Sequence, residues 1–328
     1  MKALLITCIL LTATLFAHAQ QDTIKKDSAR MIIVTIAGGN IITGYLVSDD
    51  EKELVVQTEL VGRVSIPKYT IKKISNKVTG SVVNGEYWFG NPNATRYIIG
   101  PSAIPLRKGE GYYQNLYLFV HSGSVGVTDH ISVGGGTELL TPLVSGQAPA
   151  MFFATVKAGF PIAKNLHAGG GILYVNFRNK LFGSYNNHLG TVFGLGTYGS
   201  ENNNITLGAG WGYQRAGVEN PFSGKQEQTG GISKRPTFTV SAMARVFKSL
   251  AVVTENWVFP YTENEYYSIN QPPRKVHGYR HILSYGIRIM GERVSLDMGF
   301  FNNPEIFKVI YIGVPYIACV VKFGGKKK

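Results

Sequence analysis

Two short patterns in this sequence could carry chemistry, and each lies beside a predicted β-strand. The run 194–199, GLGTYG, has the G-x-G-x-x-G spacing with which a glycine-rich turn and a following helix hold a dinucleotide pyrophosphate. Residues 200–203 are instead a polar turn before another predicted strand, so the helix is missing. The chain has 39 glycines, enough for a chance match, and we predict no cofactor site here.

The second pattern is His121 next to Ser122. A hydrolase whose active site lies on the strands of a membrane barrel uses these residue types. Catalysis would require the imidazole within hydrogen-bond reach of the hydroxyl. Neighbouring residues of a strand point to opposite faces, so these two side chains cannot meet, and the same holds for His121 and Ser124. A lipid-modifying enzyme therefore stays an alternative without assigned catalytic residues, and we expect no enzyme.

Metal binding and disulfide formation are not expected. The two cysteines are Cys8 and Cys319, and no Cys/His cluster has the spacing of zinc ligands. Cys8 lies in a predicted signal peptide, which leaves Cys319 without an internal partner.

Charged side chains at inward positions of predicted strands are the most informative candidates. Because a charge at mid-membrane is costly when it faces lipid, these residues are expected in a barrel lumen. Their opposite charges predict a mutually paired cluster, and a polar ligand path is the alternative. They are Arg245, Glu255, Arg288 and Asp297, with Glu138 and Lys157 on earlier strands.

Inward glycines on the strands of 131–214 would leave room beside that path for a small polar solute. They are Gly134, Gly136, Gly169, Gly171, Gly194, Gly196, Gly208, Gly210 and Gly212.

The first 30 residues predict export. Lys2 precedes an apolar stretch, and Ala17-His18-Ala19 forms a cleavage site, so 1–19 is a predicted signal peptide. Residues 20–30 are a polar linker in which Thr23 and Ser28 lie in short Asp-(Ser/Thr)-apolar motifs, the type that is O-glycosylated in exported proteins.

Residues 31–78 predict a small β domain. Five short β-rich runs follow one another with tight turns between them, which is typical of an SH3-like or Sm-like barrel. We expect this domain in the periplasm, followed by a linker at 79–95.

The region 96–323 predicts an antiparallel transmembrane β-barrel of about 12 strands, followed by a basic tail at 324–328. In 204–214, for example, Ile205, Leu207 and Trp211 alternate with small or polar residues, a period of two that excludes a helix.

Connections between these runs are short and long in turn, as in outer-membrane barrels with short periplasmic turns and long outer loops. Eleven strands, the first of them 112–127, are evident between Tyr112 and Phe323, and a short turn joins the first pair. An even count then requires one more before it, and we predict 96–106 as that strand despite its prolines.

Four segments between residues 91 and 136 resemble a family. NPNATRY at 91–97, GPSA at 100–103 and KGEGYYQN at 108–115, with VGVTDHISVGGG at 125–136, are similar to exported proteins of Bacteroidota described as outer-membrane proteins. The resemblance implies an outer-membrane location and a barrel fold, and it implies no activity and no site residues.

The net charge of +13 would suggest nucleic acid in a cytosolic protein. In an exported chain with singly scattered basic residues we expect lipid and lipopolysaccharide as acidic partners, and no nucleic acid. The predicted function is therefore structural or the passage of small solutes, and a surface adhesin is a further alternative. The sequence leaves the oligomeric state open.

The signal sequence gives a first testable prediction. The mature protein should begin at Gln20 and fractionate with outer membranes, because export and a barrel pattern occur together. N-terminal sequencing of the membrane-bound protein checks this, and recovery in the cytosol with Met1 intact would contradict it.

Overall fold

The computed structural model describes residues 31–75, 80–83, 86–179, 184–219, 226–265 and 274–325. The chain divides into two compact units, Met1–Gly90 and Asn91–Lys328. The predicted signal peptide, the linker 20–30 and both glycosylation candidates, Thr23 and Ser28, lie outside the described residues, as does most of the basic tail. Among the described residues, no helix has the length and apolar character needed to span a membrane.

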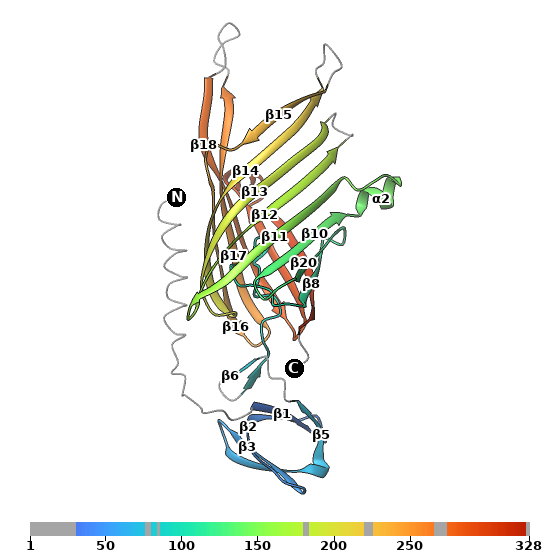
Figure 1. Cartoon of the computed structure of the whole chain (residues 1–328), viewed down its shortest axis with the longest axis vertical. Helices are drawn as coiled ribbons and strands as arrows, with labels where there is room; N and C mark the ends of the chain where they lie inside the picture. Colours follow the sequence, from blue (N-terminus) through green and yellow to red (C-terminus); the bar gives the residue numbers. More distant parts are fainter. Residues whose placement is uncertain are drawn as a thin grey trace. The chain divides into compact units, whose positions relative to one another are not determined.

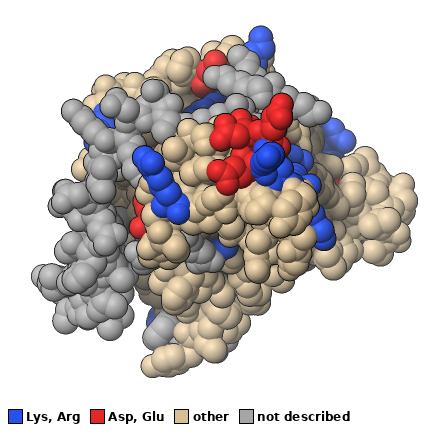
Figure 2. All heavy atoms as spheres, turned by 90° about the horizontal axis from the view of Figure 1, so that it is seen from below, with Lys and Arg blue, Asp and Glu red and all other residues tan. Residues whose placement is uncertain are grey.

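The first unit contains a five-stranded antiparallel sheet in the order β4-β3-β2-β1-β5. Its buried side chains are Ile32, Val34, Leu54, Val56 and Ile66. Figure 2 shows acidic and basic side chains side by side on the face seen from below, and Lys68 Nζ lies 2.8 Å from Asp49 Oδ1. The elements are β1 (Met31–Ile36), β2 (Ile41–Asp49), β3 (Glu53–Thr58), β4 (Gly62–Pro67), the 3₁₀ turn η1 (Lys68–Thr70) and β5 (Ile71–Ser75).

These five strands are those predicted, whereas the SH3-like assignment itself stays a prediction. The predicted linker 79–95 is wrong in part, because β6 (Ser81–Val83) and β7 (Glu86–Trp88) pair as a two-stranded ribbon. Val82 pairs with Tyr87 and Ser81 with Trp88, and β-branched and aromatic residues favour strand pairing over an open linker.

The second unit is an antiparallel barrel (Figure 1). In the part of the chain that the structure describes, 12 strands form its wall, and it closes because β8 pairs with β20 and β13 with β14. The wall strands are β8 (Glu110–Leu116), β9 (Val120–Gly126), β10 (Ile131–Glu138), β11 (Met151–Ala163), β12 (Leu166–Asn179), β13 (Ser184–Gly199), β14 (Asn203–Glu219), β16 (Thr237–Phe247), β17 (Leu250–Glu265), β18 (Arg274–Met290), β19 (Val294–Asn302) and β20 (Val314–Gly324).

One further strand, β15 (Gln226–Ile232), lies in the same place in the strand order as β16 and so does not add a strand to the wall. It pairs with the upper part of β14, and β16 pairs with the lower part of the same strand. Two short helices, α2 (Leu140–Ser145) and α3 (Pro304–Val309), lie in connections at the end opposite the predicted tight turns.

The predicted strand count is right, but two of the predicted strands, 112–127 and 96–106, are wrong. Residues 112–127 form two strands, β8 and β9, joined at Tyr117 and Leu118, which adopt φ values of 50° and 68°. Such a left-handed two-residue turn is usually built from Asn and Gly, and the side chains here gave no turn signal.

Residues 96–106 make only an isolated bridge, Arg96 to Pro101, and are not a wall strand. Pro101 and Pro105 lack the N–H that ladder pairing needs. The wall also closes without this segment, because β8 pairs directly with β20 and leaves no ladder position for it. The barrel therefore begins at Glu110.

Side chains on the wall alternate between solvent-inaccessible and outward positions, as predicted for 204–214. Leu207 is 60% exposed on the outer surface, whereas Thr206 is completely buried on the inner one. The prediction fails at Gly194 and Gly196, which face outward, because Thr197 and Leu195 occupy the inner face of β13. Apolar residues were assumed to face lipid, and Leu195 points inward.

Replacing Leu207 with Arg tests the outer surface. At the bilayer midplane this change should destabilise the barrel by about 2–4 kcal/mol, because the guanidinium would face hydrocarbon. Urea unfolding in lipid vesicles measures the difference.

The control is Leu60→Arg in the small domain, where a 73% exposed leucine meets water. It should change stability by no more than about 0.5 kcal/mol. Equal effects of both changes would show that Leu207 does not face lipid.

Candidate functional site: the barrel lumen and its plug

Residues 91–106 lie inside the barrel, and we call them the plug. Within the described residues, its polar atoms bond to inward side chains of strands from β11 to β20, around the barrel. Tyr97 OH is 2.6 Å from Asn204 Oδ1 on β14, and Ala103 N donates to Thr197 Oγ1 on β13 at 2.7 Å. Tyr316 OH on β20 donates to Ile98 O at 2.7 Å. Contact with opposite sides of the wall places the segment in the lumen.

The plug is a loop that enters and leaves at the end where the tight turns lie. Asn91 Nδ2 donates to Glu201 O in the β13–β14 turn, and Lys108 N, just after the plug, donates to Asp129 Oδ1 in the β9–β10 turn. Ser102 N bonds Thr95 O and Tyr97 N bonds Gly100 O, so the two arms run antiparallel. The tip, 98–100, therefore points toward the opposite end.

Arg288 is the main connection between wall and plug. Its guanidinium is completely buried and binds Asp297 in bidentate fashion, Nε to Oδ1 at 2.7 Å and Nη2 to Oδ2 at 2.9 Å. The remaining donors reach plug carbonyls, Nη1 to Asn93 O at 2.8 Å and Nη2 to Tyr97 O at 2.7 Å. The planar five-donor fork of arginine suits such simultaneous bonding.

Asp297 also binds the plug arginine. Arg96 Nη2 lies 2.7 Å from Asp297 Oδ2, and Arg96 is 2% exposed. One buried carboxylate therefore pairs with two buried guanidinium groups. Sequence reasoning missed Arg96 because the segment was predicted as a strand, although its position within the NPNATRY run was a usable signal.

Glu255 holds the tip of the plug. Its carboxylate is completely buried and accepts from Ile99 N and Gly100 N, each at 2.8 Å, and from Trp257 Nε1 at 2.8 Å. A Cβ on Gly100 would lie 3.0 Å from both the Glu255 carboxylate and the Trp257 ring, so glycine permits this close approach.

Lys157 binds the plug from the opposite side. Its ammonium donates to Ile104 O at 2.8 Å, Ser102 O at 3.0 Å and Thr95 O at 3.2 Å. Three donors meet three carbonyls, which satisfies the plug backbone without a counter-ion.

The predicted mutual cluster is therefore only partly right. Arg288 and Asp297 pair, but Glu255 binds the plug backbone. Arg245 donates to Asn202 Oδ1 and Lys248 O in tight turns at the barrel rim. Glu138 accepts from Thr141 N and Ala150 N in the connection that contains α2. The sequence could not show that a chain segment lies between the wall charges.

Some of the glycines expected to leave an empty path instead face the plug or a large side chain. A Cβ on Gly169 would lie 3.4 Å from Ala103 Cα, and at Gly159, which was not among the predicted glycines, a Cβ would lie 2.3 Å from Ala103 O. Gly171 faces the ring of Phe193 in the same way. The lumen beside these glycines is thus occupied.

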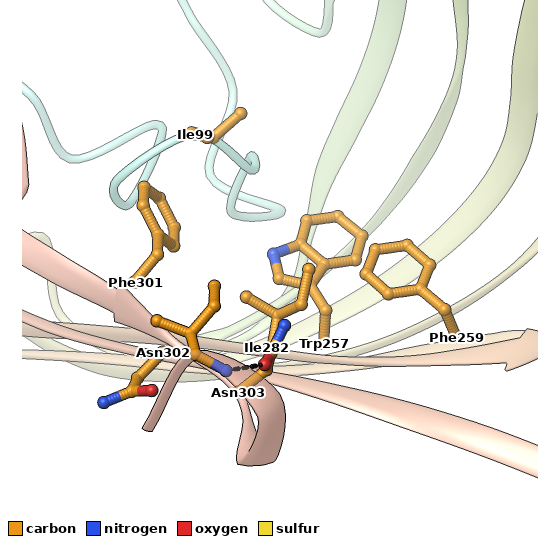
Figure 3. Close-up of a pocket in the computed structure, with 8 residues that line it drawn as sticks. Ile99, Trp257, Phe259, Ile282, Phe301, Asn302 and Asn303 are labelled. Atoms are coloured by element: carbon orange, nitrogen blue, oxygen red, sulfur yellow. Dashed lines mark hydrogen bonds between the residues drawn. The ribbon is translucent and has the colours of Figure 1, made fainter. Parts of the chain in front are cut away.

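An apolar pocket of about 370 Å³ lies above the plug tip (Figure 3). The Trp257 and Phe259 rings stack nearly parallel, with centroids 5.5 Å apart, and Phe301 contacts Tyr316 edge-on. Ile99 of the plug reaches the pocket and is 58% exposed. The lining residues are Ile99, Trp257, Phe259, Ile282, Phe301, Asn302, Asn303 and Ile306.

The two patterns first considered for chemistry lie apart from this site. His121 bonds Tyr113 OH on the outer surface, whereas Ser122 pairs with Gln114 and Gly136 in the ladder and faces inward. Residues 194–199 lie within β13, without a following helix. Within the described ranges, no three His, Cys, Asp or Glu side chains converge as metal ligands would.

Comparison with known proteins gives only a distant similarity. No family model matches the sequence, and no curated protein matches it either. Among solved structures, the chain is similar to the translocator domain of autotransporter NalP from Neisseria meningitidis, at 8% identity and a TM-score of 0.32. The similarity covers 66% of this chain and 86% of that one. The barrel is therefore described from its own strand pairing.

The contact of Gly159 with the plug can be tested by adding a side chain. Gly159→Val should displace Ala103 and destabilise the barrel by about 1–3 kcal/mol, because the added atoms overlap a backbone carbonyl. The temperature at which heat-modifiable gel migration is lost measures the effect.

Gly194→Val is the matched control, since a Cβ there meets nothing within 4 Å and would face outward. Its migration should stay at the wild-type temperature or above. A larger loss at Gly194 than at Gly159 would contradict the assigned faces of the wall.

Proposed function

We propose that this chain is a non-enzymatic outer-membrane β-barrel whose lumen is closed by its own plug, and that solutes pass only when the plug moves. The observation that carries the proposal is the set of buried bonds from Arg288, Asp297, Glu255 and Lys157 to residues 91–106. The same lumen would otherwise offer a polar path.

The outer surface supports a membrane location. Large apolar side chains are exposed on neighbouring strands all around the barrel, among them Val192, Leu207, Phe238, Ile287 and Ile317. A soluble monomer rarely exposes a continuous apolar area of this extent, whereas a lipid-facing wall requires it. Since closed barrels satisfy every backbone hydrogen bond within the wall, the fold suits a bilayer.

The direction of the chain supports an orientation. The plug begins at the tight-turn end, and outer-membrane barrels place their tight turns in the periplasm. The domain before Gly90 would then be periplasmic. The longer connections would face outward, where lipopolysaccharide is the acidic partner of a chain with a net charge of +13.

Two alternatives make different predictions. A lipid-modifying enzyme should change the mass spectrum of lipid A when the gene is deleted. An adhesin should lose binding to its surface when the long connections are shortened, with no change in conductance.

Conductance in planar bilayers tests the plug directly. Wild-type protein should show no steady open level. Replacing 93–105 with a short Gly-Ser linker should give a steady open level, because both ends of the plug lie at the same barrel end. Arg288→Met should give intermittent openings, because the wall ladder stays intact while the plug loses the guanidinium. Since the change removes the buried bonds of that guanidinium, it should lower the free energy of unfolding by about 3–5 kcal/mol.

Arg245→Met is the matched control, a buried arginine bonded to tight turns. It should leave the lumen closed. A wild-type protein with a steady open level, or a linker variant that stays closed, would refute the plug function. Asp297→Ala should lower the free energy of unfolding more than Arg288→Met does, because it leaves both Arg96 and Arg288 without their carboxylate.

A further inference from the structure

We propose that the pocket above the plug tip binds the alkyl chain of a small amphiphile, with the head group in the lumen. The inference rests on the proposed function in one respect, since the plug residue Ile99 forms part of the pocket. The plug by itself implies no ligand, whereas the pocket indicates one of a particular chemical class.

The chemistry of the lining selects an uncharged, apolar group. Six of the lining side chains are isoleucine, phenylalanine or tryptophan, and none is charged. Glu255, the carboxylate bound by the indole of the lining residue Trp257, already accepts three N–H groups. An ionic head group would therefore find no counter-ion here, whereas hydrocarbon would be removed from water.

The size and position of the pocket fit one chain rather than a protein partner. Its volume of about 370 Å³ lies at the lower end of the range for small-molecule sites, about 300–1,000 Å³. It lies between the inner wall, formed here by β17, β18 and β19, and the plug tip (Figure 3). The stacked rings of Trp257 and Phe259 offer a flat apolar surface.

The exposure of Ile99 indicates that an apolar group covers it. The plug residues on both sides of it, Ile98 and Gly100, are buried, yet this isoleucine, which lines the pocket, is 58% exposed. A loop tip inside a hydrated lumen would gain by carrying a polar residue there, unless an apolar group covers it.

A ligand in this pocket would touch the connection that holds the plug. Trp257 lines the pocket and donates to the same Glu255 carboxylate that accepts from Gly100 N. The pocket wall and the plug tip therefore share one buried carboxylate, so ligand contacts reach the plug through two side chains.

Quenching of Trp257 fluorescence by bromine tests the site in lipid vesicles. The chain has three tryptophans, so Trp88→Phe with Trp211→Phe leaves Trp257 as the single fluorophore. One arm adds free 11-bromo-1-undecanol, and the other uses phospholipid brominated on its acyl chain. A protein that keeps only the outward Trp211 reports quenching from the lipid phase.

We expect saturable quenching of Trp257, and at least tenfold weaker binding after Ile99→Asp. Saturation by the free alcohol identifies an amphiphile that enters through the lumen, and saturation by the brominated lipid identifies a membrane chain. The bromoundecanoate anion should bind more weakly than the alcohol. Ile312→Asp is the matched control, since this isoleucine is 59% exposed and does not line the pocket.

The alkyl site is refuted if Trp257 is quenched linearly in both arms, as Trp211 is expected to be, or if Ile99→Asp binds like wild type. Circular dichroism and heat-modifiable migration show that each variant is folded. Conductance separates the two proposals. A steadily open wild-type barrel with saturable quenching refutes the plug function alone, and a closed barrel without it refutes the ligand site alone.

Discussion

A chain segment inside a closed barrel must find partners for its backbone N–H and C=O groups, and this constraint governs the lumen. The wall has already used its own backbone groups in the ladder, so the groups that the plug does not bond within itself must be met by side chains. Arg288 and Lys157 donate to plug carbonyls, and Glu255 accepts from plug N–H groups. The buried charges therefore serve as backbone ligands as well as ion-pair partners.

The two halves of the wall contribute different things to the same packing problem. Strands β17, β18 and β19 provide Glu255, Arg288 and Asp297, which bind the plug from one side. Strands β11 and β12 provide Gly159 and Gly169, where the plug backbone lies so close that a Cβ would overlap it or press against it. Charged side chains bind the plug on one side of the lumen, and glycines leave space for its backbone on the other. Together they allow an irregular loop to fit inside a regular barrel.

The plug tip and the pocket meet at Ile99 and Trp257, which both line the pocket. Below these residues, polar groups of the plug are satisfied by the wall, and above them the lining is apolar. Trp257 belongs to both regions, through its ring in the pocket and its N–H on Glu255. Amphipathic rings of this kind are suited to such a boundary, because one edge is polar and the faces are not.

The sequence by itself determined the barrel and the inward direction of Arg245, Glu255, Arg288 and Asp297, because alternation with period two follows from strand geometry. The predicted number of strands was right only because two errors cancelled: 112–127 is two strands and 96–106 is none. The sequence could not determine what the inward side chains bind. Residues 96–106 carry apolar and β-branched residues that are typical of a strand, and only the wall, which closes by pairing β8 with β20, decides that they lie inside. Gly194 and Gly196 show the same limit, since a glycine has no side chain to indicate its face. Partners distant in sequence, such as Arg96 and Asp297, are set by tertiary structure alone.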